Sequence, residues 1–290
     1  MKNTVFNFVR GILIGIAEVI PGVSGGTIAL ITGIYQRLID QAALAVEALI
    51  KFTKPKKLFT GLKNLEWKLL LPVLIGMFTA LVLGARIIEP LLEDYPIQLR
   101  ALFAGLVFVG ILIPFKMVKN TKKGDWRLSD YLLALVAATI AFFLTGIPAS
   151  EISEPSYLFV FIAAAIAICA LVIPGVSGSF FLLSIGMYAP TIAAVNDRNI
   201  PYLLTFALGA FIGLASFVIL LRWLLENKPR PTLVIVSGLM LGSLRALWPW
   251  QDEMRNLLPP NEAVIQSLIL FLLGGFVVWL LMKVEKQLTS

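Results

Sequence analysis

Long uncharged stretches divide this chain, and short charged segments separate them. The stretches lie at 19–36, 69–85, 101–115, 131–150, 155–196, 199–221, 231–244 and 263–282. A helix that crosses a lipid bilayer needs about 20 apolar residues, and the stretch at 155–196 is long enough for two such helices. Charged residues make up 14% of the chain, against about 25% in a typical soluble domain. The sequence therefore predicts an all-α polytopic membrane protein.

The residue types that are missing narrow the classes of function. The chain contains no His and a single cysteine, Cys169, which excludes an intramolecular disulfide. The usual general base and the commonest metal ligand are therefore absent, and we expect no metal, no cofactor and no enzymatic activity. A net charge of +7 is typical of a membrane protein whose basic loops face anionic lipid, so we expect no nucleic-acid partner.

One six-residue motif interrupts two of the apolar stretches. Ile-Pro-Gly-Val-Ser-Gly occupies 20–25 and returns at 173–178, and nine of the sixteen positions that begin at these two points are identical. Proline ends a helix because it lacks the N–H donor and clashes with the preceding turn, and glycine adopts conformations closed to other residues. Each motif therefore breaks its stretch into a hairpin, which gives ten helical elements in the whole chain.

A second match supports duplication of the entire chain. Residues 91–96 resemble residues 224–229 at an offset of 133 positions, whereas the motifs are 153 positions apart. The difference is about the length of the basic segment at 51–68. We therefore divide the chain into two homologous repeats, 1–150 and 151–290. Each repeat has five helical elements, which are a broken or re-entrant helix hairpin followed by three spanning helices.

The charges of the loops predict how the two repeats are oriented. Loops with an excess of Lys and Arg lie at 51–68, 116–127, 222–230 and 283–286, and acid-rich segments lie at 89–94 and 151–154. Basic loops stay in the cytoplasm, so both termini are expected there, and the second repeat begins on the opposite side from the first. This arrangement is an inverted-topology repeat, which is common in secondary transporters. The segment 51–68 is either an amphipathic surface helix or an unstructured loop.

The two broken hairpins also provide the candidate binding site. A serine before a helix can accept a hydrogen bond from its first turn, and the free N–H groups and dipole at a helix N-terminus favour an anion. Two such ends that meet inside the membrane would form a neutral cradle for an anionic group, and the alternative is a pair of self-capped kinks. The residues assigned to the cradle are Gly22, Ser24, Gly25, Gly26, Thr27, Gly175, Ser177, Gly178 and Ser179.

The doubled motif, followed in the first repeat by Gly33, Ile34 and Tyr35, resembles the prokaryotic polyprenyl-phosphate transporter family over nearly the whole chain. The resemblance implies a flippase in the bacterial inner membrane. Such a protein would return undecaprenyl phosphate from the outer to the inner leaflet for reuse in cell-envelope synthesis, including that of peptidoglycan. The second motif departs from the first at Ser179 and Phe180, so the two half-sites are expected to bind unequally.

Charged residues near the apolar stretches are further candidates. Glu18 lies one turn before the first break and has Leu171 as its repeat counterpart. An ionised carboxyl is costly inside a membrane, so Glu18 is either a proton carrier that couples transport to the proton gradient or a structural partner of a nearby Arg or of free backbone donors. Four arginines are candidate phosphate ligands, and the alternative is that they snorkel to lipid headgroups. Arg37 lies at a cytoplasmic helix end, and the three near outer helix ends are Arg86, Arg100 and Arg245.

Two other classes of function remain open from the residues alone. One is a transporter or channel for a small soluble anion, and the other is an intramembrane enzyme that acts on a lipid phosphate. A lateral opening to lipid would favour the flippase over the small-anion transporter. The sequence does not fix the oligomeric state, and a homodimer is compatible with it.

Overall fold

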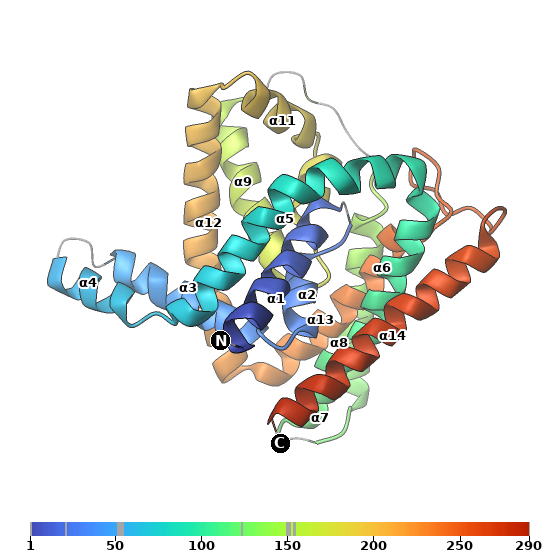
Figure 1. Ribbon diagram of the computed structural model, residues 1–290, viewed down its shortest axis with the longest axis horizontal. Helices are drawn as coiled ribbons and strands as arrows, with labels where there is room; N and C mark the ends of the chain where they lie inside the picture. The colour runs from blue at the N-terminus through green and yellow to red at the C-terminus, as the bar shows by residue number, and fades with distance from the viewer. Residues whose placement is uncertain are drawn as a thin grey trace.

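The computed structural model describes residues 2–20, 22–50, 55–122, 124–148, 152 and 155–289. Side chains are described for these residues except 2, 3, 55, 82, 84–89, 92, 93 and 284–289. In the described ranges the fold is entirely helical apart from one isolated bridge between Gln251 and Leu257. The all-α expectation is therefore confirmed (Figure 1).

The described part of the first half contains eight α-helices, and the second half contains six and one short 3-10 helix, η1. The helices are α1 (Lys2–Val19), α2 (Gly25–Ile31), α3 (Tyr35–Ile50), α4 (Pro55–Lys63), α5 (Trp67–Asp94), α6 (Pro96–Gly110), α7 (Leu112–Lys119), α8 (Leu128–Leu144), α9 (Tyr157–Val172), α10 (Gly178–Ser184), α11 (Tyr188–Asn196), α12 (Ile200–Asn227), α13 (Pro229–Ser243), η1 (Leu244–Leu247) and α14 (Val264–Thr289). The fourteen α-helices of the described residues exceed the ten expected elements by four. Breaks also separate α2 from α3, α6 from α7 and α10 from α11, and α4 is an additional helix.

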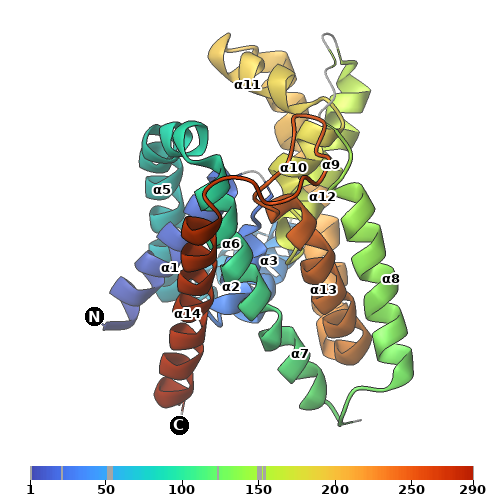
Figure 2. The same cartoon turned by 90° about the vertical axis from the view of Figure 1, so that its right-hand side faces the viewer.

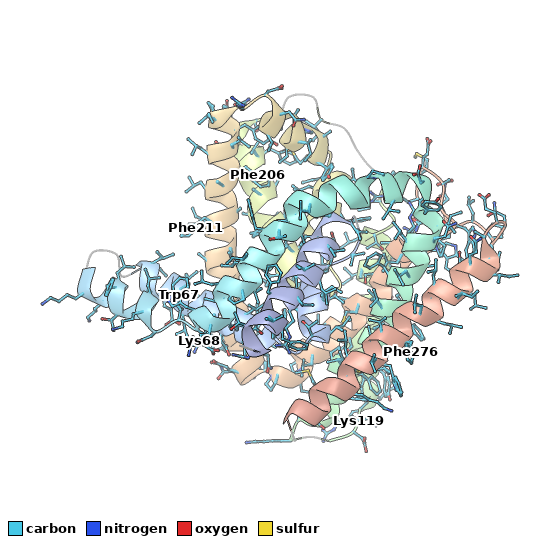
Figure 3. The ribbon with its side chains drawn as sticks, in the orientation of Figure 1. Trp67, Lys68, Lys119, Phe206, Phe211 and Phe276 are labelled. Carbon is cyan, nitrogen blue, oxygen red and sulfur yellow. The ribbon has the colours of Figure 1, made fainter. Side chains whose placement is uncertain are left out.

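Several helices are suited to cross a membrane. Among the described residues, four helices are long and apolar enough, at Pro96–Lys119, Ile200–Asn227, Pro229–Leu247 and Val264–Lys283, and six qualify if two bent pairs each count as one span. Side chains on these helices point outward as a lipid-facing surface requires. Phe211 on α12 and Phe276 on α14 are 52% and 55% exposed (Figure 3).

The long helices pack in four closely associated pairs, which are α1 with α5, α9 with α12, α6 with α14, and α8 with α13. Small residues bring the backbones together, as is usual between helices in membranes. A Cβ atom at Gly238 would lie 2.2 Å from the Ala134 carbonyl oxygen, and one at Gly242 would lie 2.1 Å from that of Ala138. Because the residue numbers rise together along both helices, α8 and α13 run parallel.

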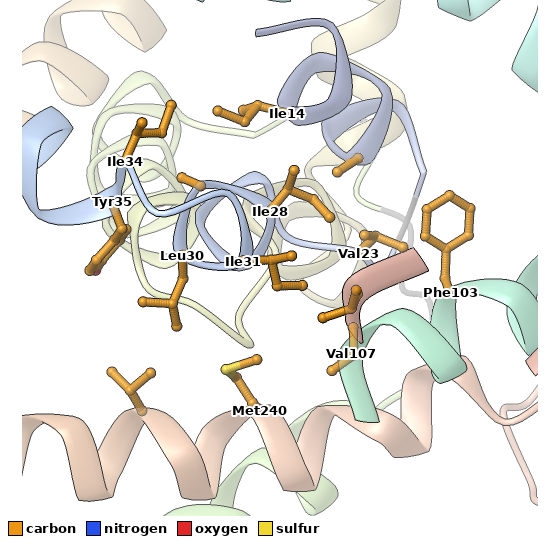
Figure 4. Packing of buried hydrophobic residues seen from close by; sticks show 14 of the residues in the cluster. Ile14, Val23, Ile28, Leu30, Ile31, Ile34, Tyr35, Phe103, Val107 and Met240 are labelled. Carbon is orange, nitrogen blue, oxygen red and sulfur yellow. The ribbon is translucent and has the colours of Figure 1, made fainter. Parts of the chain in front are cut away.

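The short helices α2 and α10 lie in the interior. Ile28, Leu30 and Ile31 of α2 belong to the largest cluster of buried apolar residues in the described chain, together with Val107 of α6 and Met240 of α13 (Figure 4). A seven-residue helix such as α2 is marginal in water. Its stability therefore comes from this packing, which also fixes the position of the first broken hairpin.

Two opposite faces of the molecule can be distinguished in Figure 2. The face that we call the termini face carries the C-terminus and the α7–α8 connection, and the N-terminus lies at the side of the molecule between this end and the 248–262 loop. The loop face carries the 248–262 loop between η1 and α14. The end of α7 and the C-terminus therefore lie at the same end of the molecule.

The basic segment at 51–68 forms a helix over much of its length. Helix α4 packs on α3 and is bent by 77° from the start of α5, and Figure 1 shows it at the side of the molecule. Its Phe59 side chain is 72% exposed, on a helix that also carries Lys56 and Lys57. The helical alternative is therefore correct for Pro55–Lys63, and 51–54 lie outside the described residues.

A buried ion pair fastens the termini face. Arg230, at the start of α13, pairs with Asp130 in the first turn of α8, and both residues are buried. The same guanidinium donates to Thr121 Oγ1 at 3.2 Å, to the Gly124 carbonyl at 2.9 Å and to the Asp125 carbonyl at 2.7 Å. These contacts attach the second half of the chain to the α7–α8 connection of the first half.

We expect Arg230→Met to lower the melting temperature of the detergent-solubilised protein strongly. The change leaves the Asp130 carboxylate buried without its cation, which typically costs about 3–5 kcal/mol. The matched control is Arg37→Met, which removes the exposed pair between Arg37 and Glu66 and should cost at most about 1 kcal/mol. Equal losses in the two variants would contradict the importance of the buried pair.

Candidate functional site

The two broken hairpins meet in the interior and hydrogen-bond to each other. The Gly175 N–H donates to Thr27 Oγ1 at 2.8 Å, and Ser24 Oγ donates to the Ile173 carbonyl oxygen at 3.3 Å. The Tyr35 hydroxyl donates to the carbonyl oxygen of Val172 at 3.2 Å. Residues of the first hairpin thus provide hydrogen-bond partners for backbone groups at the second break, and the Ile173 carbonyl oxygen also accepts from the Val176 N–H at 3.1 Å.

The glycine after each proline has the same backbone conformation. Gly22 has φ of 88° and Gly175 has φ of 85°, which lie in the region that residues with a side chain rarely adopt. Pro21 lies outside the described residues. At Gly175 a Cβ atom would also lie 2.5 Å from the backbone nitrogen of Met240, so α13 packs directly on the second break.

The caps that follow the two breaks are different. Ser177 Oγ accepts from the Phe180 N–H at 3.3 Å and bonds to Ser179 Oγ at 3.1 Å, as expected for a capping serine. Ser24 does not cap α2, and that prediction is wrong because its hydroxyl is used across the interface with the second half. Glu18 Oε1 instead accepts from the Gly25 N–H at 2.8 Å.

The remaining glycines of the motifs lie at backbone contacts. A Cβ atom at Gly26 would lie 2.8 Å from the Val172 carbonyl oxygen, and one at Gly178 would lie 2.5 Å from that of Ala167. Two N–H groups at these helix N-termini, those of Gly25 and Phe180, already have acceptors within their own half of the chain. The close approach of Gly26 to Val172 joins the two halves.

Space for a ligand lies beside the two breaks. A cavity of 270 Å³ is lined by residues from 141–147 at the end of α8, from 175–185 around α10, and by Gly22, Leu239 and Ser243. Among the residues assigned to the cradle, Gly22, Gly175 and Ser177 line it. Most of the wall is apolar, and the hydroxyl groups come from Thr145, Ser177, Ser184 and Ser243.

An arginine from the 248–262 loop lies against this cavity. The Arg255 guanidinium donates to Ser184 Oγ at 3.0 Å and to the carbonyl oxygen of Ile147, and it lies 4.0 Å from the centre of the Phe180 ring. All three of these residues line the cavity. An antiparallel bridge joins Gln251 to Leu257, which flank Arg255 in the sequence. The tip of the loop that carries Arg255 therefore lies against the cavity.

Two further arginines lie near Arg255. Arg245 Nη2 donates to the Arg255 carbonyl oxygen at 3.1 Å, and its guanidinium lies 5.0 Å from the Phe142 ring. Burial, and then the charges of Arg245 and Arg100, lower the pKa of Arg255. Within the described residues none of the three arginines forms a salt bridge, and the Nε and Nη1 atoms of Arg245 are buried without a hydrogen-bond partner. We refer to Arg100, Arg245 and Arg255 as the arginine cluster.

The other sequence candidates lie elsewhere or were not described. Arg37 is exposed on α3 and pairs with Glu66, which also bonds to Gln41. Arg86 belongs to α5, but its side chain lies outside the described residues. Arg255 was not predicted because it lies in a polar loop beside Asp252 and Glu253, where an arginine resembles an ordinary solvated residue. Only its tertiary contacts reveal it.

Comparisons with known proteins identify the family to which this chain belongs. The family profile described as "VCA0040-like: Undecaprenyl phosphate translocase-like" matches residues 14–265. A polyprenyl-phosphate transporter of Vibrio cholerae is 38% identical over 87% of this chain and 80% of its own length. A polyprenyl-phosphate transporter of Staphylococcus aureus is 27% identical over 93% of each chain. No solved structure matches. The chain therefore belongs to the VCA0040-like family of undecaprenyl phosphate translocase-like proteins.

Proposed function

We propose that this protein is a flippase that moves undecaprenyl phosphate, or a related polyprenyl phosphate, from the outer to the inner leaflet for reuse in cell-envelope synthesis. The observation that carries the proposal is the 270 Å³ cavity at the two helix breaks with an arginine cluster against it. The names of the curated relatives support the substrate class, and those relatives are described as transporters rather than enzymes.

The chemistry of the cavity suits both parts of such a lipid. Guanidinium groups bind phosphate through paired N–H donors, and Arg245 and Arg255 supply them. The hydroxyl group of Ser177 also lines the cavity. Apolar wall residues such as Phe181 provide the surface that an isoprenoid chain requires, which a small soluble anion would not use.

We further propose that the two halves are inverted-topology repeats. Three pairs of corresponding helices have equal lengths, since α5 and α12 each have 28 residues, α6 and α13 each have 15, and α2 and α10 each have 7. The pairing of α1 with α5 has its counterpart in α9 with α12. The last helix of each half packs on the other half, as α8 does on α13 and α14 does on α6.

Two such halves can alternate around a central site and expose it first to one side and then to the other. In this proposal the termini face is cytoplasmic and the loop face, with the arginine cluster, receives the lipid phosphate. The hairpins α1–α2–α3 and α9–α10–α11 are re-entrant, and their unpaired backbone is tolerated because it is buried in protein.

Reconstituted vesicles test the function directly. We expect Arg245→Gln and Arg255→Gln each to slow the flipping of polyprenyl phosphate at least ~10-fold, because charge-assisted hydrogen bonds to phosphate are lost. Arg37→Gln is the matched control, since it removes an exposed arginine paired with Glu66. If Arg37→Gln slows flipping while Arg245→Gln and Arg255→Gln do not, this site is refuted. Rapid uptake of inorganic phosphate would instead favour the small-anion transporter.

The topology has its own test. In a background in which Cys169 is replaced by Ala, we expect single cysteines at Lys56 and Lys122 to react with a membrane-impermeant reagent only from the cytoplasmic side. A cysteine at Asn261, which lies exposed in the loop before α14, should react only from outside. Labelling of the Lys122 position from outside would overturn the proposed orientation.

Coupling to protons through Glu18 gives another expectation. Moving an anionic phosphate inward against an inside-negative potential costs about 2.3 kcal/mol per charge per 100 mV, and a co-transported proton would reduce that cost. Glu18→Gln keeps an oxygen that can accept from Gly25 N–H but cannot carry a proton. The variant should still bind lipid phosphate, and its transport should not respond to an imposed pH gradient. A response equal to that of the parent would make Glu18 purely structural.

A further inference from the structure

The internal repeat can be extended to the last helix of each half through matching backbone contacts. A Cβ atom at Gly238 would meet the carbonyl oxygen of Ala134 on α8, and one at Gly105 would meet that of Phe271 on α14. Gly105 and Gly238 are themselves equivalent in the second sequence match. Ala134 therefore corresponds to Phe271, and each residue of α8 corresponds to the residue 137 positions later in α14.

This correspondence identifies a second pocket as the counterpart of the cavity. The cavity is lined by Leu144, Ser184 and Ile185, whose equivalents are Leu281, Ile31 and Thr32. All three equivalents line one pocket, together with Arg10 and three apolar residues of α1. Its lining residue Leu281 lies in the C-terminal part of α14, whereas the arginine cluster lies at the 248–262 loop that precedes α14.

The second pocket is much smaller than the cavity. Its volume is 50 Å³, against 270 Å³ for the cavity. Such a volume admits only a few water molecules and is too small for a lipid phosphate. The structure thus has one open and one nearly closed member of an equivalent pair.

The second pocket also contains a cation and a hydroxyl group. The Arg10 guanidinium donates to Asn7 Oδ1 at 3.1 Å and lies 4.4 Å from the Phe6 ring centre, as the Arg255 guanidinium does on Phe180. The Thr32 hydroxyl donates to the Ile28 carbonyl oxygen at 2.8 Å. The sequence position equivalent to Arg10 is Ala163, so this arginine belongs to the second pocket alone.

We propose that the pocket at Arg10, Thr32 and Leu281 is the release site for the lipid phosphate on the termini face, closed in this conformation. The inference rests on the proposed function and adds a second phosphate-binding position to it. When the halves exchange conformations, this pocket opens as the 270 Å³ cavity closes, and Arg10 receives the phosphate from the arginine cluster. The guanidinium recognises the phosphate, and the apolar residues of α1 lie along the path of the isoprenoid chain.

A steric block tests the proposal without touching the cavity. Leu281→Trp fills the pocket and should reduce flipping of a short-chain polyprenyl phosphate in vesicles at least ~10-fold, because the termini-face site cannot open to the ligand. The matched control is Leu280→Trp, since the neighbouring Leu280 side chain is 47% exposed on the same helix. This control should flip lipid at the parental rate.

A second readout separates a blocked release site from a lost binding site. A cysteine at Leu144, in the Cys169→Ala background, reports on the open cavity through its reaction with an impermeant thiol reagent. The same lipid phosphate should protect this cysteine equally with and without Leu281→Trp. Equal flipping by Leu281→Trp and Leu280→Trp would overturn the proposal, and so would loss of protection at Leu144 in the Leu281→Trp variant.

If Leu281→Trp does not give a monodisperse protein, substitutions of Arg10 decide the question. Arg10→Gln should slow flipping at least ~10-fold because a charge-assisted contact to phosphate is lost. Arg10→Lys should retain part of the flipping rate. In both variants the lipid phosphate should still protect the cysteine at Leu144 from the thiol reagent. Parental flipping by Arg10→Gln would overturn the release site and leave the proposed function standing. Absence of flipping by the parent protein itself would instead remove the proposed function.

Discussion

Backbone groups that are freed by a helix break cannot remain unpaired at membrane depth, and the way this chain pairs them determines the rest of the structure. The Gly175 N–H is satisfied by Thr27, the Ile173 carbonyl by Ser24 and the Val172 carbonyl by Tyr35. All three acceptors or donors come from the other half of the chain. Contact between the two hairpins therefore contributes to the stability of the second break.

This dependence links the architecture to the proposed transport. Gly175 lines the cavity beside the breaks and also donates its N–H to Thr27 of the other half. Relative movement of the halves must preserve or exchange the hydrogen bonds at the centre. Arg230 and Asp130 fasten the termini face more firmly, so the loop face, where the arginines repel one another, is the less constrained end.

The sequence was informative where local chemistry decides the structure. Proline and glycine predict the two breaks, and the positive φ angles of Gly22 and Gly175 confirm the need for glycine. The sequence was less informative where a partner comes from elsewhere in the chain. Ser24 has the local features of a helix cap, yet a carbonyl group 149 positions away takes its hydroxyl. Arg255 reaches the cavity only because its loop folds back onto α10, which local sequence does not encode.

The exchange of the last helices between the halves has a consequence for biosynthesis. Helices α6 and α8 are synthesised before α13 and α14, which are their main packing partners. During insertion into the membrane the glycine-lined face of α6 must therefore be covered by lipid or by another protein until the second half arrives. The first half of the chain is thus an assembly intermediate whose contact surfaces, including the acceptor Thr27, await residues that have not yet been translated.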